Sequence, residues 1–125
     1  TIGQMCAGCH GNFHHAINEG QEGTGNDLSG TWIRHPSDVL IPNEGEYAAY
    51  TTYNPLAPAA KQNLTADMQN SPTVTPGSDI VTCISCHRPH GSPYPDMLRW
   101  DYAECSAAST SSECGCYVCH TAKDK

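Results

Sequence analysis

The segment Cys83-Ile84-Ser85-Cys86-His87 places two cysteines three residues apart and a histidine directly after the second cysteine. The same spacing recurs at Cys6-Ala7-Gly8-Cys9-His10 and at Cys116-Tyr117-Val118-Cys119-His120. Residues i and i+3 of a helical turn lie on one face, so the two sulfurs of each segment point to the same side. The chain therefore carries three copies of one small unit, here called motifs one, two and three in chain order.

The C-x-x-C-H pattern is the attachment motif of c-type haem. Both sulfurs of one turn can reach the two vinyl groups of a porphyrin, and the following histidine can bind its iron. The sequence thus predicts three covalently attached haems c, each with one iron. The predicted attachment cysteines are Cys6, Cys9, Cys83, Cys86, Cys116 and Cys119, and the predicted proximal ligands are His10, His87 and His120.

Two other kinds of site share parts of this pattern. A zinc knuckle usually pairs two C-x-x-C units, which would leave the third unit unexplained, and it requires no histidine after each pair. A redox dithiol of the thioredoxin type needs a βαβ context, and the sequence around the motifs does not indicate one. Three copies therefore favour haem over a zinc-stapled or disulfide-stapled binding module.

The remaining histidines are His14, His15, His35 and His90, and they are candidates for the distal sides of the three irons. On a continuing helix, residues three or four apart share a face. His90 therefore cannot easily bind the iron of His87, nor His14 that of His10, so each should serve a different haem. His14 and His15 point about 100° apart on a helix, and we expect at least one of them to be a ligand.

His35 precedes Pro36, which favours an extended backbone and leaves the side chain able to reach across to an iron. Methionine is the other common axial ligand, but Met5, Met68 and Met97 more often fill gaps against a haem face. Ligation by histidine alone predicts six-coordinate irons with no open position for a substrate. That favours an electron carrier over an enzyme.

The composition does not support a large aliphatic core. Leu, Ile, Val and Phe number sixteen of 125 residues, and the net charge is −7, a combination typical of disordered chains. The cofactors must then supply the core. We expect a single domain over residues 1–125, mostly irregular, wrapped around three haems, with little or no sheet. Short helices are expected at residues 4–17, 80–87 and 114–122, and an extended run at 39–41.

Cys105 and Cys114 remain outside the three motifs, and the loop between them is rich in Ser, Thr and Ala. A disulfide closing this loop suits an exported protein and would add roughly 2–3 kcal/mol. In the alternative, Cys114 forms a variant attachment motif with Cys119 and Cys116 is spare. Asn63-Leu64-Thr65 also matches a glycosylation sequon, a triplet that is common by chance.

Charge and hydropathy exclude several partners. Six Lys and Arg against thirteen Asp and Glu leave no basic patch for nucleic acid and no polybasic membrane anchor. No apolar stretch approaches the roughly 20 residues that span a bilayer. Because the sequence opens at Thr1 rather than at Met, we expect a processed product from which an export signal has been removed.

The run Cys83–Ser92, with its C-x-x-C-H-x-x-H-G order, resembles the doubled C-x-x-C-H cytochromes. Together with Trp32–Pro36 and the last C-x-x-C-H, it is similar to small exported multihaem cytochromes of metal-respiring bacteria. The resemblance implies closely stacked bis-histidine haems and a place at the cell surface, outside the cell or in the periplasm. It implies electron transfer to other redox proteins or extracellular acceptors.

Some cytochromes of this type polymerise head to tail, with a histidine of one subunit binding a haem of the next. A conducting filament of this kind and a discrete soluble carrier are both compatible with the sequence. A haem reductase with one open axial position is the enzymatic alternative.

Overall fold

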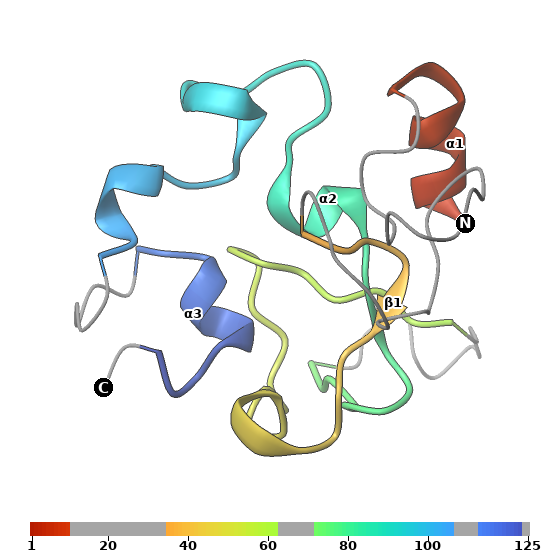
Figure 1. Cartoon of the computed structure of the whole chain (residues 1–125), viewed down its shortest axis with the longest axis vertical. Coiled ribbons are helices and arrows are strands. Elements are labelled where there is room, and N and C mark those ends of the chain that lie inside the picture. Colours follow the sequence, from red (N-terminus) through yellow and green to blue (C-terminus); the bar gives the residue numbers. More distant parts are fainter. Residues whose placement is uncertain (11–34, 63–71, 107–112, 124–125) are drawn as a thin grey trace.

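The computed structural model describes residues 1–10, 35–62, 72–106 and 113–123. Most of these residues form turns and irregular segments around short helices and one small sheet (Figure 1). The prediction of a mostly irregular chain with a few short helices and little sheet is confirmed. The predicted helical residues after His10, the sequon at Asn63 and the candidate ligands His14 and His15 lie outside the described residues.

Each α-helix contains one C-x-x-C pair. The α-helices are α1 (Ile2–His10), α2 (Cys83–Cys86) and α3 (Cys116–Cys119), and the 3₁₀ helices are η2 (Gly45–Tyr47), η4 (Pro95–Met97) and η5 (Tyr102–Glu104). Strands β1 (Val39–Leu40) and β2 (Ile80–Val81) pair antiparallel, with Val39 opposite Val81. Among the residues described, every helix is too short or too polar to pass through a lipid bilayer.

The helix predicted at residues 80–87 was wrong in its first part. Ile80 and Val81 are β-branched and form β2, because they pair with the extended run predicted at 39–41. The helix begins only at Cys83, after the buried Thr82, whose backbone N–H donates to Ser85 Oγ at 3.0 Å. The helix predicted at 114–122 is also shorter and spans only α3. Cofactor attachment needs one turn, and the described helices α2 and α3 contain little more.

A small hydrophobic cluster sits beside motif three. Ile41, Tyr50 and Val74 are buried, and Val118 and Cys119 of α3 pack against them. The Tyr50 hydroxyl donates to the Ala57 carbonyl oxygen at 2.8 Å, and burial raises the pKa of Tyr50 to about 12. The aromatic side chain is therefore a neutral part of this core, and α3 is held on it through Val118 and Cys119.

The turn before β2 is tied down by a buried carboxylate. Asp79 accepts hydrogen bonds from the backbone N–H of Thr75 at 2.8 Å and from Lys61 Nζ at 2.6 Å. Its side chain is only 3% exposed, so the ammonium group compensates the burial of its charge. This pair fixes the chain just ahead of motif two.

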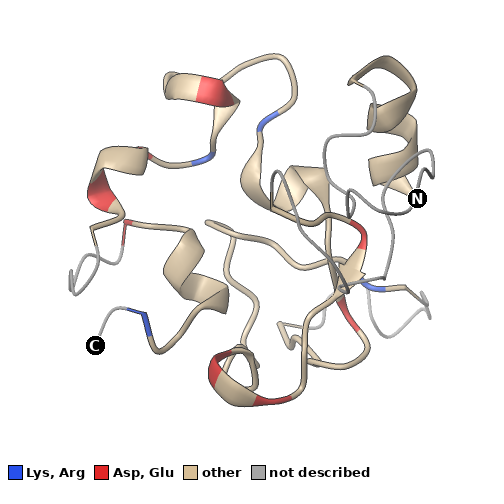
Figure 2. Cartoon of the chain, viewed as in Figure 1, with Lys and Arg blue, Asp and Glu red and all other residues tan. Residues whose placement is uncertain are grey.

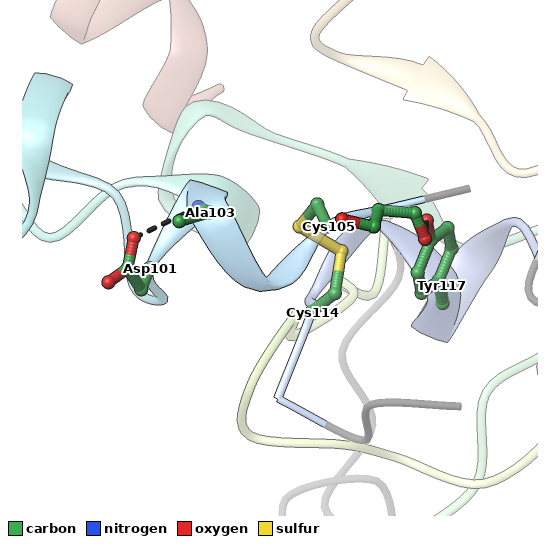
Figure 3. The surroundings of a disulfide bond; sticks show 6 residues. Asp101, Ala103, Cys105, Cys114 and Tyr117 are labelled. Carbon is green, nitrogen blue, oxygen red and sulfur yellow. Dashed lines mark hydrogen bonds between the residues drawn. A yellow bond between two sulfur atoms is a disulfide. The ribbon is translucent and has the colours of Figure 1, made fainter. Parts of the chain in front are cut away.

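Cys105 and Cys114 form a disulfide, which confirms the predicted pairing (Figure 3). The Tyr117 hydroxyl of α3 donates to the Ser106 carbonyl oxygen beside the bridge, and Asp101 caps η5 by accepting from the Ala103 N–H at 3.0 Å. Because Cys114 is bonded to Cys105, it is not available for a variant attachment motif with Cys119. Cys116 therefore remains free for motif three.

Trp100 and Gly115 pack against each other at the start of motif three. Trp100 is 3% exposed, and a Cβ built on Gly115 would lie 2.2 Å from an atom of the indole ring. The backbone of Gly115 is in the ordinary right-handed region (φ −65°), so the glycine is required by this contact and not by its conformation. A side chain here would push the indole away from α3.

We predict that Gly115→Ala destabilises the protein by about 1–3 kcal/mol, because the added methyl group overpacks the site. The measurement is the free energy of unfolding in denaturant. Gly8→Ala is the matched control, since it also lies beside attachment cysteines but a Cβ there meets nothing within 4 Å. An equal loss in both variants would contradict the packing role given to Gly115.

Candidate haem-binding site

Motif one lies in the last turn and a half of α1, and the helix docks through its N-terminal end. Gly3 is buried against the Asp38 carboxylate, where a Cβ would come within 2.5 Å of a carboxylate oxygen. The Thr1 hydroxyl donates to the same carboxylate. Asp38 itself has a left-handed backbone (φ 58°). These contacts fix the start of α1 and leave Cys9 and His10 exposed at its other end.

Motif two is held by the segment that follows it. The backbone N–H groups of Arg88 and Arg99 donate to Met97 and Cys86 carbonyl oxygens, at 2.9 and 2.8 Å, in an antiparallel arrangement. The Asp96 carbonyl oxygen accepts from His87 Nδ1 at 2.8 Å, and Asp96 has a left-handed backbone (φ 54°). A carbonyl oxygen can only accept, so Nδ1 of His87 is protonated and its Nε2 carries the lone pair.

Motif three is held by a segment far away in the sequence. His120 Nδ1 donates to Glu46 Oε1 at 3.1 Å, and the Thr121 hydroxyl donates to the Glu46 carbonyl oxygen. The Tyr47 ring stands edge-on to the His120 ring, with centroids 5.1 Å apart. The hydrogen bond from His120 lowers the pKa of Glu46, so this carboxylate is charged at neutral pH. Such outer hydrogen bonds orient metal-binding histidines and set the nitrogen that binds.

The thiols of neighbouring motifs lie close enough to influence one another. Burial and the nearby Cys83 thiol raise the pKa of Cys6. Burial, then the Cys116 and Cys119 thiols, raise the pKa of Cys86 to about 12. Motif two is thus adjacent to motif one on one side and to motif three on the other, in agreement with the position of α2 between α1 and α3 (Figure 1).

A cavity of about 300 Å³ lies between motifs two and three. Its lining is mostly apolar and includes attachment cysteines of both motifs; the residues are His35, Pro36, Ser37, Val81, Thr82, Cys83, Cys86, His87, Leu98, Trp100, Tyr102 and Cys116. Trp100 lines this cavity, and its indole Nε1 is buried without a hydrogen-bond partner among the described residues. An unpaired buried donor is costly, and an acceptor on a bound group would satisfy it.

These residues fit a covalently attached haem. An apolar wall suits the porphyrin face, a thioether sulfur is uncharged and suits sites where burial raises thiol pKa values, and the free Trp100 Nε1–H suits a propionate oxygen. The residues that would hold the haems are the six free cysteines and the three following histidines.

The described residues do not fit the zinc alternative. Within those ranges, the one group of three close metal-binding side chains is Cys105, Cys114 and Cys116, and two of these are joined in the disulfide. A disulfide sulfur is not a thiolate and does not bind zinc as one.

The predicted distal ligands fall at separate places. His35 lines the cavity and its ring centroid is 6.2 Å from that of His120. The His90 ring lies 6.4 Å from that of His10, the histidine of motif one. Met5 and Met97 are exposed, at 73% and 42%. The structure therefore brings the two described distal candidates to motifs one and three.

Sequence reasoning missed Glu46 and Asp96, which orient His120 and His87. Glu46 is 74 residues from its histidine, and nothing in its local pattern distinguishes it from the other acidic residues. Asp96 acts through its backbone carbonyl oxygen, so its side-chain type carries no signal.

Residues 76–125 match the family model of the doubled CXXCH motif. The match contains motifs two and three, with the disulfide between them, and leaves motif one outside. No curated protein and no solved structure matches the chain. The matched region thus carries a signature of multihaem c-type cytochromes, and this signature implies electron transfer.

Proposed function

We propose that this chain is an electron conduit with three c-type haems, one on each C-x-x-C-H motif, and histidine on both sides of the irons. When bound, haem supplies an iron that alternates between two oxidation states. The protein holds the porphyrins, orients the axial imidazoles and limits access of water. It is proposed as a carrier and not as an enzyme.

The observation that carries this proposal is that the three motifs lie close together in space. Burial and then the Cys83 thiol raise the pKa of Cys6, and the Cys116 and Cys119 thiols add to the effect of burial on the pKa of Cys86, so thiols of neighbouring motifs lie close together. Groups attached at these positions would be neighbours, and short separations are what electron tunnelling requires. A substrate site would instead need one iron kept apart with an open axial position.

The first test is the cofactor count. Intact-protein mass should equal the chain plus three haems, and the ferric and ferrous spectra should show low-spin iron. Cys116→Ala with Cys119→Ala should lose one haem. Cys105→Ala with Cys114→Ala is the matched control and should keep all three, because those sulfurs form the disulfide. A colourless protein, a different haem count or carbon monoxide binding to the reduced wild type would contradict the proposal.

A second test concerns Glu46, whose charge lies against His120. In Glu46→Gln the amide oxygen still accepts the Nδ1 hydrogen bond, so the main change is the loss of a negative charge. A negative charge favours ferric iron, so one of the three reduction potentials should rise while the other two stay. The measurement is a spectroelectrochemical titration.

The matched control is Glu44→Gln, which removes the charge of an exposed acid two residues before Glu46. It should leave all three potentials in place. Equal shifts in the two variants would show a general charge effect and would contradict the specific role of Glu46.

We propose that the protein acts outside the cytoplasm, at the cell surface or beyond it, with the periplasm as the alternative. The Cys105–Cys114 disulfide supports this, since disulfides persist in oxidising compartments. Figure 2 shows acidic positions on η2, η4 and η5 and no segment where Lys and Arg gather among the described residues. This distribution of charge does not suit nucleic acid, and the proposed partners are other redox proteins or extracellular electron acceptors.

We propose head-to-tail assembly into an extracellular filament, with a discrete carrier as the alternative. Motifs one and three lie on opposite sides of motif two, so a haem at each end of the subunit could meet the next copy. A contact between unlike ends that does not close into a ring builds a filament. Electron microscopy of the purified protein should show fibres, and uniform single particles would leave the discrete carrier.

A further inference from the structure

Two pairs of histidine rings lie at nearly the same separation. The centroids of His10 and His90 are 6.4 Å apart, and those of His35 and His120 are 6.2 Å apart. Each pair joins the histidine of one C-x-x-C-H motif to a histidine from a segment outside that motif. The planes of the rings meet at 32° in the first pair and at 87° in the second.

This separation is the one expected for two imidazoles on opposite sides of one metal ion. With about 2 Å from metal to nitrogen and about 1.1 Å from that nitrogen to the ring centre, two opposed rings have centroids about 6.2 Å apart. The rings can turn about the metal–nitrogen bonds, so both interplanar angles are allowed. Direct ring contact covers a range of about 4.5–7 Å, so separation alone does not decide between the two arrangements.

The Nδ1 hydrogen bonds of His35 and His120 favour a shared metal. His35 Nδ1 donates to the Pro36 carbonyl oxygen at 2.8 Å, and His120 Nδ1 donates to Glu46 at 3.1 Å. In each ring Nε2, the nitrogen that does not make this hydrogen bond, is the one that would bind iron. The hydrogen bonds on Nδ1 are those that hold metal-binding histidines.

Exposure and backbone geometry support the pair of His10 and His90. Both residues are exposed, so burial of apolar surface contributes little to a direct contact between their rings. His90 has a left-handed backbone (φ 56°), which is uncommon for a residue other than glycine and costs free energy. The backbone turns sharply after motif two and brings the ring to motif one, three residues beyond His87.

We infer that His90 is the distal ligand of the motif-one iron, opposite His10, and that His35 is the distal ligand of the motif-three iron, opposite His120. This inference rests on the proposed three-haem function and deepens it. Each pair also ties separate parts of the chain together. His90 connects the segment after motif two to motif one, and His35 connects the segment before β1 to motif three.

Deletion of one haem at a time tests which iron each histidine binds. His90→Ala should turn one of three irons high-spin. In a background that lacks the motif-one haem, Cys6→Ala with Cys9→Ala, His90→Ala should change none of the two remaining irons. In the background that lacks the motif-three haem, Cys116→Ala with Cys119→Ala, it should still change one. His35→Ala should change one iron in the background that lacks the motif-one haem and none in the background that lacks the motif-three haem.

The measurement is the number of high-spin irons per protein by electron paramagnetic resonance, with the haem count taken from the intact mass. Each background is the matched control for the other. If His90→Ala still converts one iron without the motif-one haem, or converts none in the otherwise unchanged protein, the assignment is wrong. Loss of the proposed function itself would show separately, as a wild-type mass without three haems.

If a variant that lacks one haem fails to fold, a second measurement on the single variants tests the same pairing. Low-spin ferric iron between near-perpendicular imidazoles gives a signal with a larger maximum g value than iron between nearly parallel ones. His35→Ala should remove a large-g signal, since its pair stands at 87°, and His90→Ala should leave that signal in place. The reverse result, or loss of the same signal in both variants, would overturn the pairing.

Discussion

For a haem to attach to a C-x-x-C-H motif, two sulfurs and one imidazole must reach the same porphyrin, and one helical turn places all three on one side. The protein repeats this turn three times and packs the rest of the described chain around the results. Its own hydrophobic cluster is small and centres on Ile41, Tyr50 and Val74, with Cys119 of motif three packed against it. The cavity beside motif two is walled by Val81, Leu98 and Trp100. Attachment of haem would complete a core that the side chains only begin.

Contacts across long stretches of sequence set the chemistry of the histidines. Each Nδ1 donates a hydrogen bond. The acceptor is in the next residue for His35, nine residues away for His87 and 74 residues away for His120. Each of these hydrogen bonds leaves Nε2 as the nitrogen that would bind iron. The left-handed conformation of Asp96 is the cost of aiming its carbonyl oxygen at His87. The irregular segments are therefore supports for ligands, which explains why the chain needs so little regular structure.

Local chemistry was predictable from the sequence, and long-range contacts were not. The C-x-x-C spacing places each helix, and the leftover Cys105 and Cys114 indicate their disulfide, because both depend on nearby residues. For His90 the sequence predicted only that it would not bind the iron of His87. Its approach to His10 depends on a sharp turn after Pro89. Ile80 and Val81 were expected in a helix but form a strand. The local sequence did not indicate this, because the partner strand β1 lies about forty residues earlier. Glu46 carries no local signal at all.

The three motifs follow one another in space in the same order as in the chain, with motif two in the middle. Cys83 is close to Cys6, and Cys86 is close to Cys116 and Cys119, so a haem on motif two would lie between those on motifs one and three. His87 is also the proximal histidine held by a backbone carbonyl oxygen and not by a carboxylate, unlike His120. A neutral acceptor stabilises ferric iron less than a carboxylate does. With a haem on each motif, these two hydrogen bonds would favour a higher reduction potential at motif two than at motif three.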